Sequence, residues 1–181
     1  MDKHLLNTMG GESGFTPGQY CVALYDGFKK FKDDAVYLVE TGTHFGNGTA
    51  IALLAGFEKV FTCELDEFRH QHCIGRFHDY PVELFQGYST EGLHKIMPKL
   101  DKKTMFWLDA HAEGGGVPTM EELDIISEHT KDSTILIDDI PAYFGDGEQL
   151  RQKLLEINSE YTIEMWHNDV RPDWMMVAYI K

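Results

Sequence analysis

Four side chains capable of acid, base or metal chemistry directly follow two apolar runs of the sequence. Asp109 and His111 follow the run TMFWL, and Asp138 and Asp139 follow the run TILI. Adjacent carboxylates at the end of a buried strand repel each other and lose hydration, so a cation or a ligand proton usually neutralises them. Their oxygens suit a magnesium-type ion better than zinc. We expect a metal site of Asp109, Asp138 and Asp139; the alternative is a turn-forming Asp109 beside a hydrogen-bonded His111.

A glycine-rich turn follows an earlier apolar run at 36–39. Glu40 closes this run, and Gly42, Gly46 and Gly48 come next, before a stretch that is typical of a helix. Glycines allow positive φ and close approach of the backbone to a ligand, and the first N–H groups of a helix are free to donate to it. The first two glycines are too far apart for the dinucleotide fingerprint G-x-G-x-x-G. The turn therefore predicts a ligand cradle, with a plain strand-to-helix turn as the alternative.

Polar residues also follow the next two apolar runs. Glu64 closes the run at 60–64, where nucleotide-binding α/β proteins commonly carry an acid that accepts hydrogen bonds from both ribose hydroxyls. A solvated acid at the start of the next helix is the alternative interpretation of Glu64. Ser89 follows the run at 82–85 and fits either a ligand-contacting loop or a helix N-cap.

The elements that must position these residues alternate between strand and helix. Helices are expected between five strands, at 36–39, 60–64, 82–85, 104–108 and 134–137. The runs at 161–166 and 175–180 form an antiparallel hairpin, because their connector is too short for a parallel crossover. This pattern predicts a three-layer α/β/α sandwich, with a mostly parallel seven-stranded sheet and a C-terminal antiparallel hairpin. Right-handed crossovers bring to one rim the residues that follow the strands, namely the glycine turn, Glu64, Ser89, Asp109 and Asp138.

Three local predictions complete the outline. Thr119 and Glu122 have the spacing of a capping box at the start of a helix. Residues 141–147, rich in Pro, Gly and aromatic side chains, predict a loop over the bound substrate. Residues 1–18, rich in Gly, Ser, Thr and Pro, predict an irregular N-terminal arm that acts as a partial lid.

Composition narrows the class of protein. A chain of 181 residues with 43% hydrophobic residues fits one domain spanning 1–181. The 16 basic and 30 acidic residues give a formal net charge of −14, which repels nucleic-acid phosphates and anionic lipids. Three cysteines without a C-x-x-C pair favour a reduced compartment. We therefore expect a cytoplasmic protein that binds neither nucleic acid nor a membrane, while the oligomeric state stays open.

The glycine turn resembles the first motif of class I S-adenosylmethionine-dependent methyltransferases, E/D-x-G-x-x-x-G. The hairpin resembles their strands six and seven, in the sheet order 3-2-1-4-5-7-6, and the resemblance covers residues 35–181. It implies a Rossmann-like methyltransferase fold and S-adenosylmethionine as the cofactor. The implied cofactor-binding residues are Glu40, Gly42, Thr43, Gly46, Asn47, Gly48, Thr49, Glu64, Tyr88, Ser89 and Asp109.

The acids of the later strands resemble a narrower group within that family. Asp109 with the pair Asp138 and Asp139 is similar to the pattern of metal-dependent small-molecule O-methyltransferases, which implies that these acids bind Mg²⁺ or a similar divalent cation. The run at 107–111, WLDAH, is similar to one in bacterial sugar-modifying methyltransferases, which implies that His111 is a general base beside a catalytic Asp109. The implied reaction is O-methylation of a small-molecule acceptor, with sugars among the candidates.

Two other classes of function fit the same pattern. A protein could keep the pocket to bind S-adenosylmethionine or a nucleotide without transferring a group. An oxidoreductase acting with NAD or on a nucleotide-sugar could also use a glycine turn followed by an acid. Methylation of nucleic-acid bases is disfavoured, because no N/D-P-P-Y/F motif follows the run at 104–108 and the net charge has the wrong sign.

Overall fold

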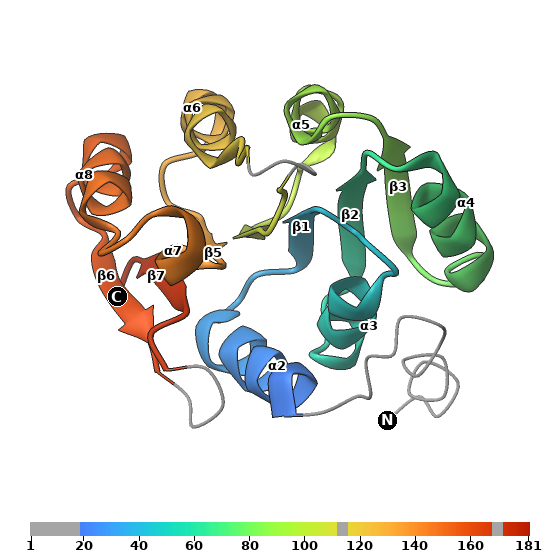
Figure 1. The fold of residues 1–181 in the computed structure, drawn as a ribbon, viewed down its shortest axis with the longest axis horizontal. Helices are drawn as coiled ribbons and strands as arrows, with labels where there is room; N and C mark the ends of the chain where they lie inside the picture. The colour runs from blue at the N-terminus through green and yellow to red at the C-terminus, as the bar shows by residue number, and fades with distance from the viewer. Residues whose placement is uncertain (1–18, 112–115, 168–171) are drawn as a thin grey trace.

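The computed structural model describes residues 19–111, 116–167 and 172–181 (Figure 1). Within these ranges, one sheet has the strand order β3-β2-β1-β4-β5-β7-β6. β5 and β7 pair antiparallel, as do β6 and β7, and the other neighbours are parallel. The strands are β1 Tyr37–Thr41, β2 Lys59–Glu64, β3 Val82–Gln86, β4 Thr104–Leu108, β5 Thr134–Ile137, β6 Thr162–Trp166 and β7 Met175–Tyr179. The predicted topology, including the terminal hairpin, is confirmed.

Helices cover both faces of the sheet. α2, α3 and α4 pack on one face, and α5, α6 and α8 pack on the other, with the short α7 at the end of β5 (Figure 1). Their bounds are α2 Gln19–Phe31, α3 Asn47–Leu54, α4 Glu67–Arg76, α5 Ser89–Ile96, the 3₁₀ turn η1 Met97–Lys99, α6 Thr119–His129, α7 Ile140–Tyr143 and α8 Glu148–Ile157. No helix in the described ranges is both long and apolar enough to cross a bilayer. The predicted three-layer sandwich is confirmed.

Two separate hydrophobic cores follow from the alternation of side chains along the central strands. On β1, Leu38 joins the core under α2 and α3, while Val39 joins the core under α5 and α6. On β4, Trp107 belongs to the first core and Phe106 to the second, and each is at most 2% exposed. Strands buried on both faces need continuous apolar runs, which is why these runs were visible in the sequence.

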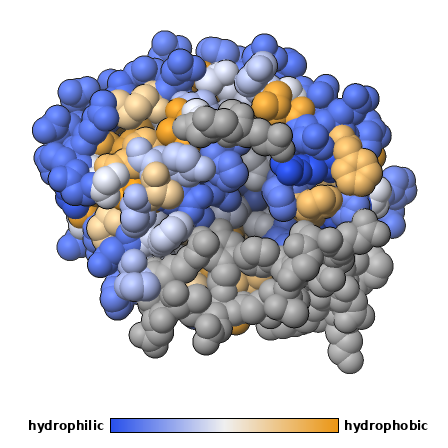
Figure 2. Space-filling model, in the orientation of Figure 1, coloured by the Kyte–Doolittle hydropathy of each residue, from blue (hydrophilic) through white to orange (hydrophobic). Residues whose placement is uncertain are grey.

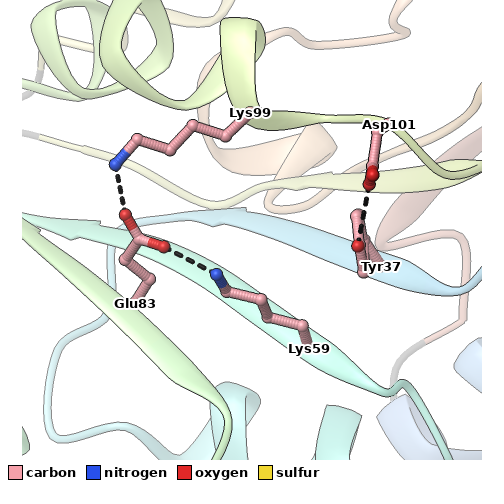
Figure 3. A network of polar contacts seen from close by, with 5 residues as sticks. All are labelled: Tyr37, Lys59, Glu83, Lys99 and Asp101. Carbon is pink, nitrogen blue, oxygen red and sulfur yellow. Dashed lines mark hydrogen bonds and ion pairs between the residues drawn. The ribbon is translucent and has the colours of Figure 1, made fainter.

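Ion pairs and a hydrogen bond fasten the amino edge of the sheet. Glu83 accepts from Lys59 at 2.7 Å and also from Lys99, and the Tyr37 hydroxyl donates to Asp101 at 2.9 Å (Figure 3). Partly exposed ion pairs of this kind each contribute about 0–1 kcal/mol. The polar groups at this edge satisfy one another, whereas those at the carboxyl edge border a cavity.

One of the local predictions is wrong, one is wrong for part of its range, and one lies outside the described residues. The N-cap of α6 is Pro118 and not Thr119, so Thr119 and Glu122 make no capping box. Glu122 lies instead on the inner face of the helix and is 0% exposed. The loop expected at 141–147 begins inside a helical turn, because α7 starts at Ile140. The N-terminal arm, residues 1–18, lies outside the described ranges.

Candidate active site

The carboxyl ends of the central strands open into a cavity of about 540 Å³. Most of the side chains selected from the sequence line it, although they come from five separate stretches of the chain. They are Glu40, Gly42, Thr43, Asn47, Gly48, Glu64, Tyr88, Ser89, Asp109, His111, Asp138 and Asp139. Gly46 and Thr49 do not line this cavity. Figure 2 shows that the coloured surface on one face of the molecule is largely hydrophilic, with apolar side chains gathered in a few places.

Steric contacts explain two of the three glycines of the turn. Gly42 has a φ of +86°, and a Cβ there would lie 2.8 Å from the backbone oxygen of Asp109. At Gly48 a Cβ would overlap both Trp107 and Glu40. The absence of side chains therefore lets the turn pack closely on the end of β4 and on the carboxylate of β1.

Gly46 packs against α4 and does not border the cavity. It is the N-cap of α3 with a φ of +81°, and a Cβ there would overlap the ring of Phe77. The structure places it against α4 and its end, away from the cavity. Gly46 therefore shapes the turn without bordering the space that a ligand would occupy.

Glu40 is a buried acid held by hydroxyl donors. Its Oε2 accepts from Thr62 at 2.7 Å and from Thr49, so Thr49 contacts a residue of the cavity wall although it does not line the cavity itself. Burial raises the pKa of Glu40 to about 7, and the two hydroxyls act in the opposite direction. The carboxyl group is thus fixed in place directly behind Gly48.

Glu64 is fixed by backbone donors. One oxygen accepts from the N–H of His44 at 2.6 Å, and the other accepts from the N–H of Asp66 at 2.9 Å. A carboxylate has about four acceptor positions, so two remain for a ligand. His44 reaches Glu64 from a left-handed backbone conformation, with a φ of +51°. Glu64 is 5% exposed and lines the cavity.

Tyr88 and Ser89 form the wall at the start of α5. Tyr88 is the N-cap of this helix and is 62% exposed, while Ser89 is its first residue and 8% exposed. The alternative in which Ser89 caps the helix is therefore wrong. Both residues border the cavity, one at its mouth and one in its wall.

The ends of β4 and β5 supply the acidic side of the cavity. Asp138 accepts from the N–H of Asp139 at 2.9 Å, and the Trp174 indole donates to Asp139. A second space of about 10 Å³, close to the volume of one water, adjoins the acids Asp109, Asp138 and Asp139. In the described part of the chain, no three His, Cys, Asp or Glu side chains are gathered closely enough to hold a metal ion.

His111 stands at the mouth of this acidic side. Its ring stacks on Tyr143 of α7, with centroids 5.9 Å apart and an interplanar angle of 26°. Both side chains are exposed, and His111 borders both the larger and the smaller cavity. The imidazole is therefore accessible to a substrate and oriented by an aromatic neighbour.

Sequence reasoning missed several residues of the site. His44, Leu65, Arg69 and Trp107 also line the cavity. Trp107 could have been selected from the sequence. Side chains alternate along a strand, so Trp107, two residues before Asp109, is expected on the same face of the sheet. Arg69 comes from α4, where nothing in the local pattern distinguishes it.

Arg76 is a further missed residue, and it supports the glycine turn from behind. Its guanidinium donates to the backbone oxygen of Phe45 and, at 3.0 Å, to Asn47 Oδ1. Burial lowers the pKa of Arg76 from its ordinary value, although an arginine stays charged at neutral pH. This contact spans 29 residues along the chain, so no local signal could have indicated it.

Solved structures share this architecture at low sequence identity. An O-methyltransferase from Bacillus cereus in complex with SAH gives a TM-score of 0.68 at 13% identity, covering 100% of this chain and 92% of its own. The O-methyltransferase TomG from Streptomyces achromogenes, in complex with SAM, gives 0.67 at 14% identity, covering 100% and 91%. This chain has the class I methyltransferase fold. No family model matches its sequence.

The methyltransferase fold does not by itself decide the acceptor. A ribosomal protein L11 methylase from Lactobacillus delbrueckii subsp. bulgaricus has the same fold, with a TM-score of 0.58 and 14% identity over 91% of this chain and 79% of its own. Unrelated acceptors are thus served by one architecture, and function must be argued from the cavity of this chain.

Proposed function

We propose that the protein is an S-adenosylmethionine-dependent methyltransferase that O-methylates a small molecule. One observation carries the proposal: the glycine turn, Glu64 and Asp109 border a single cavity beside β1 and β4. The strand order reverses between these two strands, and ligands of open α/β sheets bind outside the carboxyl ends at such a point.

The cavity has the size and the polar groups that the cofactor requires. Its volume of about 540 Å³ falls in the range of roughly 300–1,000 Å³ that small-molecule sites span. Glu64 retains two acceptor positions for the ribose hydroxyls. The backbone of the turn, from Gly42 to Gly48, and the buried Glu40 would hold the methionine end. Tyr88 and Ser89 would hold the base.

The chain contributes mainly by positioning the reactants. Bound S-adenosylmethionine supplies an electrophilic methyl group. The carboxylates of Asp109 and Asp138 give the cavity a negative side that complements a sulfonium cation. His111, exposed at the mouth, is the side chain that would take the proton of the acceptor hydroxyl. Correct orientation of two reactants can lower a barrier by about 7–11 kcal/mol.

The oxygen donors of the site suit a divalent cation, but their arrangement suits it less well. Asp109, Asp138 and Asp139 are hard oxygen donors beside a space that accommodates a water-sized ligand. However, Asp139 accepts a hydrogen bond from the Trp174 indole. Among the described residues, no three His, Cys, Asp or Glu side chains are close enough together to hold a metal ion. We propose that these acids bind Mg²⁺, and we assign the ion no step in the reaction.

We also propose that the acceptor is a sugar and that the protein is cytoplasmic. An acceptor site lined by acids would suit a polyol. The cysteines Cys21, Cys63 and Cys73 are all buried, which agrees with a cytoplasmic location. Neither inference affects the assignment of the cofactor.

Thermal unfolding with three ligands tests the proposal. At 100 times its Kd a ligand adds about 2.7 kcal/mol to stability, which should raise the Tm of a domain of this size by about 5–10 °C. We expect S-adenosylhomocysteine to produce such a shift, and NAD⁺ and UDP-glucose to produce none. A shift with NAD⁺ or UDP-glucose alone would replace the proposal with an oxidoreductase. Binding of S-adenosylhomocysteine without methyl transfer to any of a panel of catechols and sugars would favour a non-catalytic binding protein.

A further inference from the structure

Basic side chains gather at one corner of the cavity. His44 and Arg69 both line the cavity, and both pack around the ring of Phe45. The centre of the His44 ring lies 4.7 Å from the centre of the Phe45 ring, and the guanidinium carbon of Arg69 lies 5.9 Å from it. The exposed His72 also contacts Phe45, with ring centres 5.4 Å apart. Three side chains that can carry positive charge therefore surround one aromatic ring.

The backbone holds His44 at this corner without using its imidazole. His44 adopts a left-handed φ of +51°, which is uncommon for a residue other than glycine. Its N–H donates to Glu64 at 2.6 Å, while the side chain is exposed and borders the cavity. Residues held in such sparsely populated conformations gather at functional sites. The imidazole is thus presented to the cavity with its ring nitrogens uninvolved in the contact that fixes the turn.

The charges at this corner favour a negatively charged ligand. Burial lowers the pKa of His44, and the nearby Arg69 and then His111 lower it further. Arg69 stays charged at neutral pH, and its planar guanidinium matches the oxygens of a carboxylate or a phosphate. An anion bound between Arg69 and His44 would relieve their mutual repulsion. In a chain with a formal net charge of −14, a basic corner of this kind is where an anion can be held.

The basic corner and the acidic side face the same space from different strands. Arg69 belongs to α4, which follows β2, and His44 belongs to the turn after β1. The acids Asp109 and Asp138 follow β4 and β5, on the other side of the point where the strand order reverses. His111, on the acidic side, is close enough to His44 to act on its pKa. One small molecule can therefore place a hydroxyl near His111 and a negative group at the basic corner.

We propose that Arg69 and His44 bind an anionic group of the acceptor, a carboxylate or a phosphate, while the hydroxyl to be methylated lies beside His111. This inference rests on the proposed function and deepens it. It narrows the acceptor to small molecules that carry a negative charge, and for a sugar it favours a sugar acid or a sugar phosphate over a neutral sugar.

Titration with simple anions tests the inference. The Kd of inorganic phosphate and the Kd of acetate are measured by NMR on the full chain saturated with S-adenosylhomocysteine. We expect binding in the range of about 1–10 mM, which two charge-assisted hydrogen bonds can support. Tighter binding of phosphate would support a phosphorylated acceptor, and tighter binding of acetate would support a carboxylated one. Binding of neither anion would overturn the inference.

Three variants locate the bound anion. Arg69→Gln should raise the Kd about tenfold or more, because it removes a charged donor. His44→Asn should raise it about threefold, since asparagine tolerates the left-handed conformation and keeps the N–H that Glu64 accepts. Lys29→Gln removes a positive charge from an exposed position of α2 and is the matched control, with a change of less than about twofold. An unchanged Kd in Arg69→Gln would mean that the anion binds elsewhere and would overturn the inference.

Competition separates this inference from the proposed function. We expect phosphate to bind with a similar Kd in the presence and absence of S-adenosylhomocysteine, because the two ligands occupy different parts of the cavity. Release of phosphate by S-adenosylhomocysteine would assign Arg69 and His44 to the carboxylate of the cofactor, which would overturn the inference and leave the proposed function intact. Failure of wild type to bind S-adenosylhomocysteine at all would instead overturn the proposed function.

Discussion

The two halves of the cavity rim differ in how exposed some of their polar side chains are. In the half built by β1 and β2, Glu40 and Glu64 each accept two hydrogen bonds from within the chain and are at most 5% exposed. In the half built by β4 and β5, His111 is exposed and Asp139 adopts a left-handed φ of +57°. A prepared binding half beside a more open half suits a constant cofactor and a variable acceptor.

Gly48 offers the most drastic way to break the prepared half. A Cβ at this position would overlap Trp107 and Glu40, which are both at most 2% exposed. We expect Gly48→Ala to abolish binding of S-adenosylhomocysteine and to cost about 1–3 kcal/mol of stability through overpacking. Calorimetry and thermal unfolding measure the two effects.

Gly75 provides the matched control for that substitution. It lies within α4, where an added Cβ meets nothing within 4 Å. Gly75→Ala should stabilise the protein by about 0.5–1 kcal/mol and leave binding unchanged. Normal binding by Gly48→Ala would mean that the turn does not approach the ligand.

Glu64 tests the same half without disturbing its packing. In Glu64→Gln the charge is lost, and we expect the Kd of S-adenosylhomocysteine to rise about 10-fold to 100-fold, the usual worth of hydrogen bonds to a charged group. Glu67→Gln, exposed in the first turn of α4, should change it by less than about twofold. Equal effects of the two substitutions would remove Glu64 from the binding site.

The acidic half should respond to a cation instead of the cofactor. In the complex with S-adenosylhomocysteine, Asp138→Asn should weaken Mg²⁺ binding by about tenfold or more, since even partners in the outer shell of a metal alter its affinity 10-fold to 100-fold. The affinity of the Asp138→Asn variant for S-adenosylhomocysteine should stay near that of wild type. Asp26→Asn, exposed on α2, is the control. Mg²⁺ binding that is insensitive to Asp138, or absent from wild type, would contradict the metal proposal.

The dependence of stability on pH tests the buried acids without any ligand. Burial raises the pKa values of Glu40 and Glu122 to about 7 from an ordinary 4.5, so between these pH values the folded state holds protons that the unfolded state has lost. The free energy of unfolding should therefore fall as pH rises through this window and level off above pH 7. Glu122→Gln removes one of the two groups and should make the slope of Tm against pH shallower, whereas Glu121→Gln should not. Identical slopes in all three proteins would show that Glu122 titrates normally.

The fold could be predicted because strands buried on both faces leave unmistakable apolar runs. The runs that became β1, β2, β4 and β5 end at polar residues, and parallel pairing brings their carboxyl ends to one edge. The short connector before β7 excluded a parallel return. These are consequences of chain geometry, so they needed no knowledge of side-chain contacts.

The contacts that refine the site could not be predicted in the same way. The spacing of Thr119 and Glu122 fits a capping box equally well, and only the start of α6 decides which way Glu122 points. Tyr143 reaches His111 from a helical turn that the sequence favours as a loop. Arg76 and Asn47 meet through folding of distant segments. Local patterns indicate which residues reach the edge of the sheet, but packing between layers decides how they are held.

A crystal structure of the complex with S-adenosylhomocysteine tests the central claim most directly. The account predicts the ligand in the cavity of about 540 Å³, with its ribose hydroxyls within hydrogen-bond distance of Glu64 and its amino-acid end against the turn from Gly42 to Gly48. Ligand bound elsewhere, or a ribose that does not contact Glu64, would contradict it.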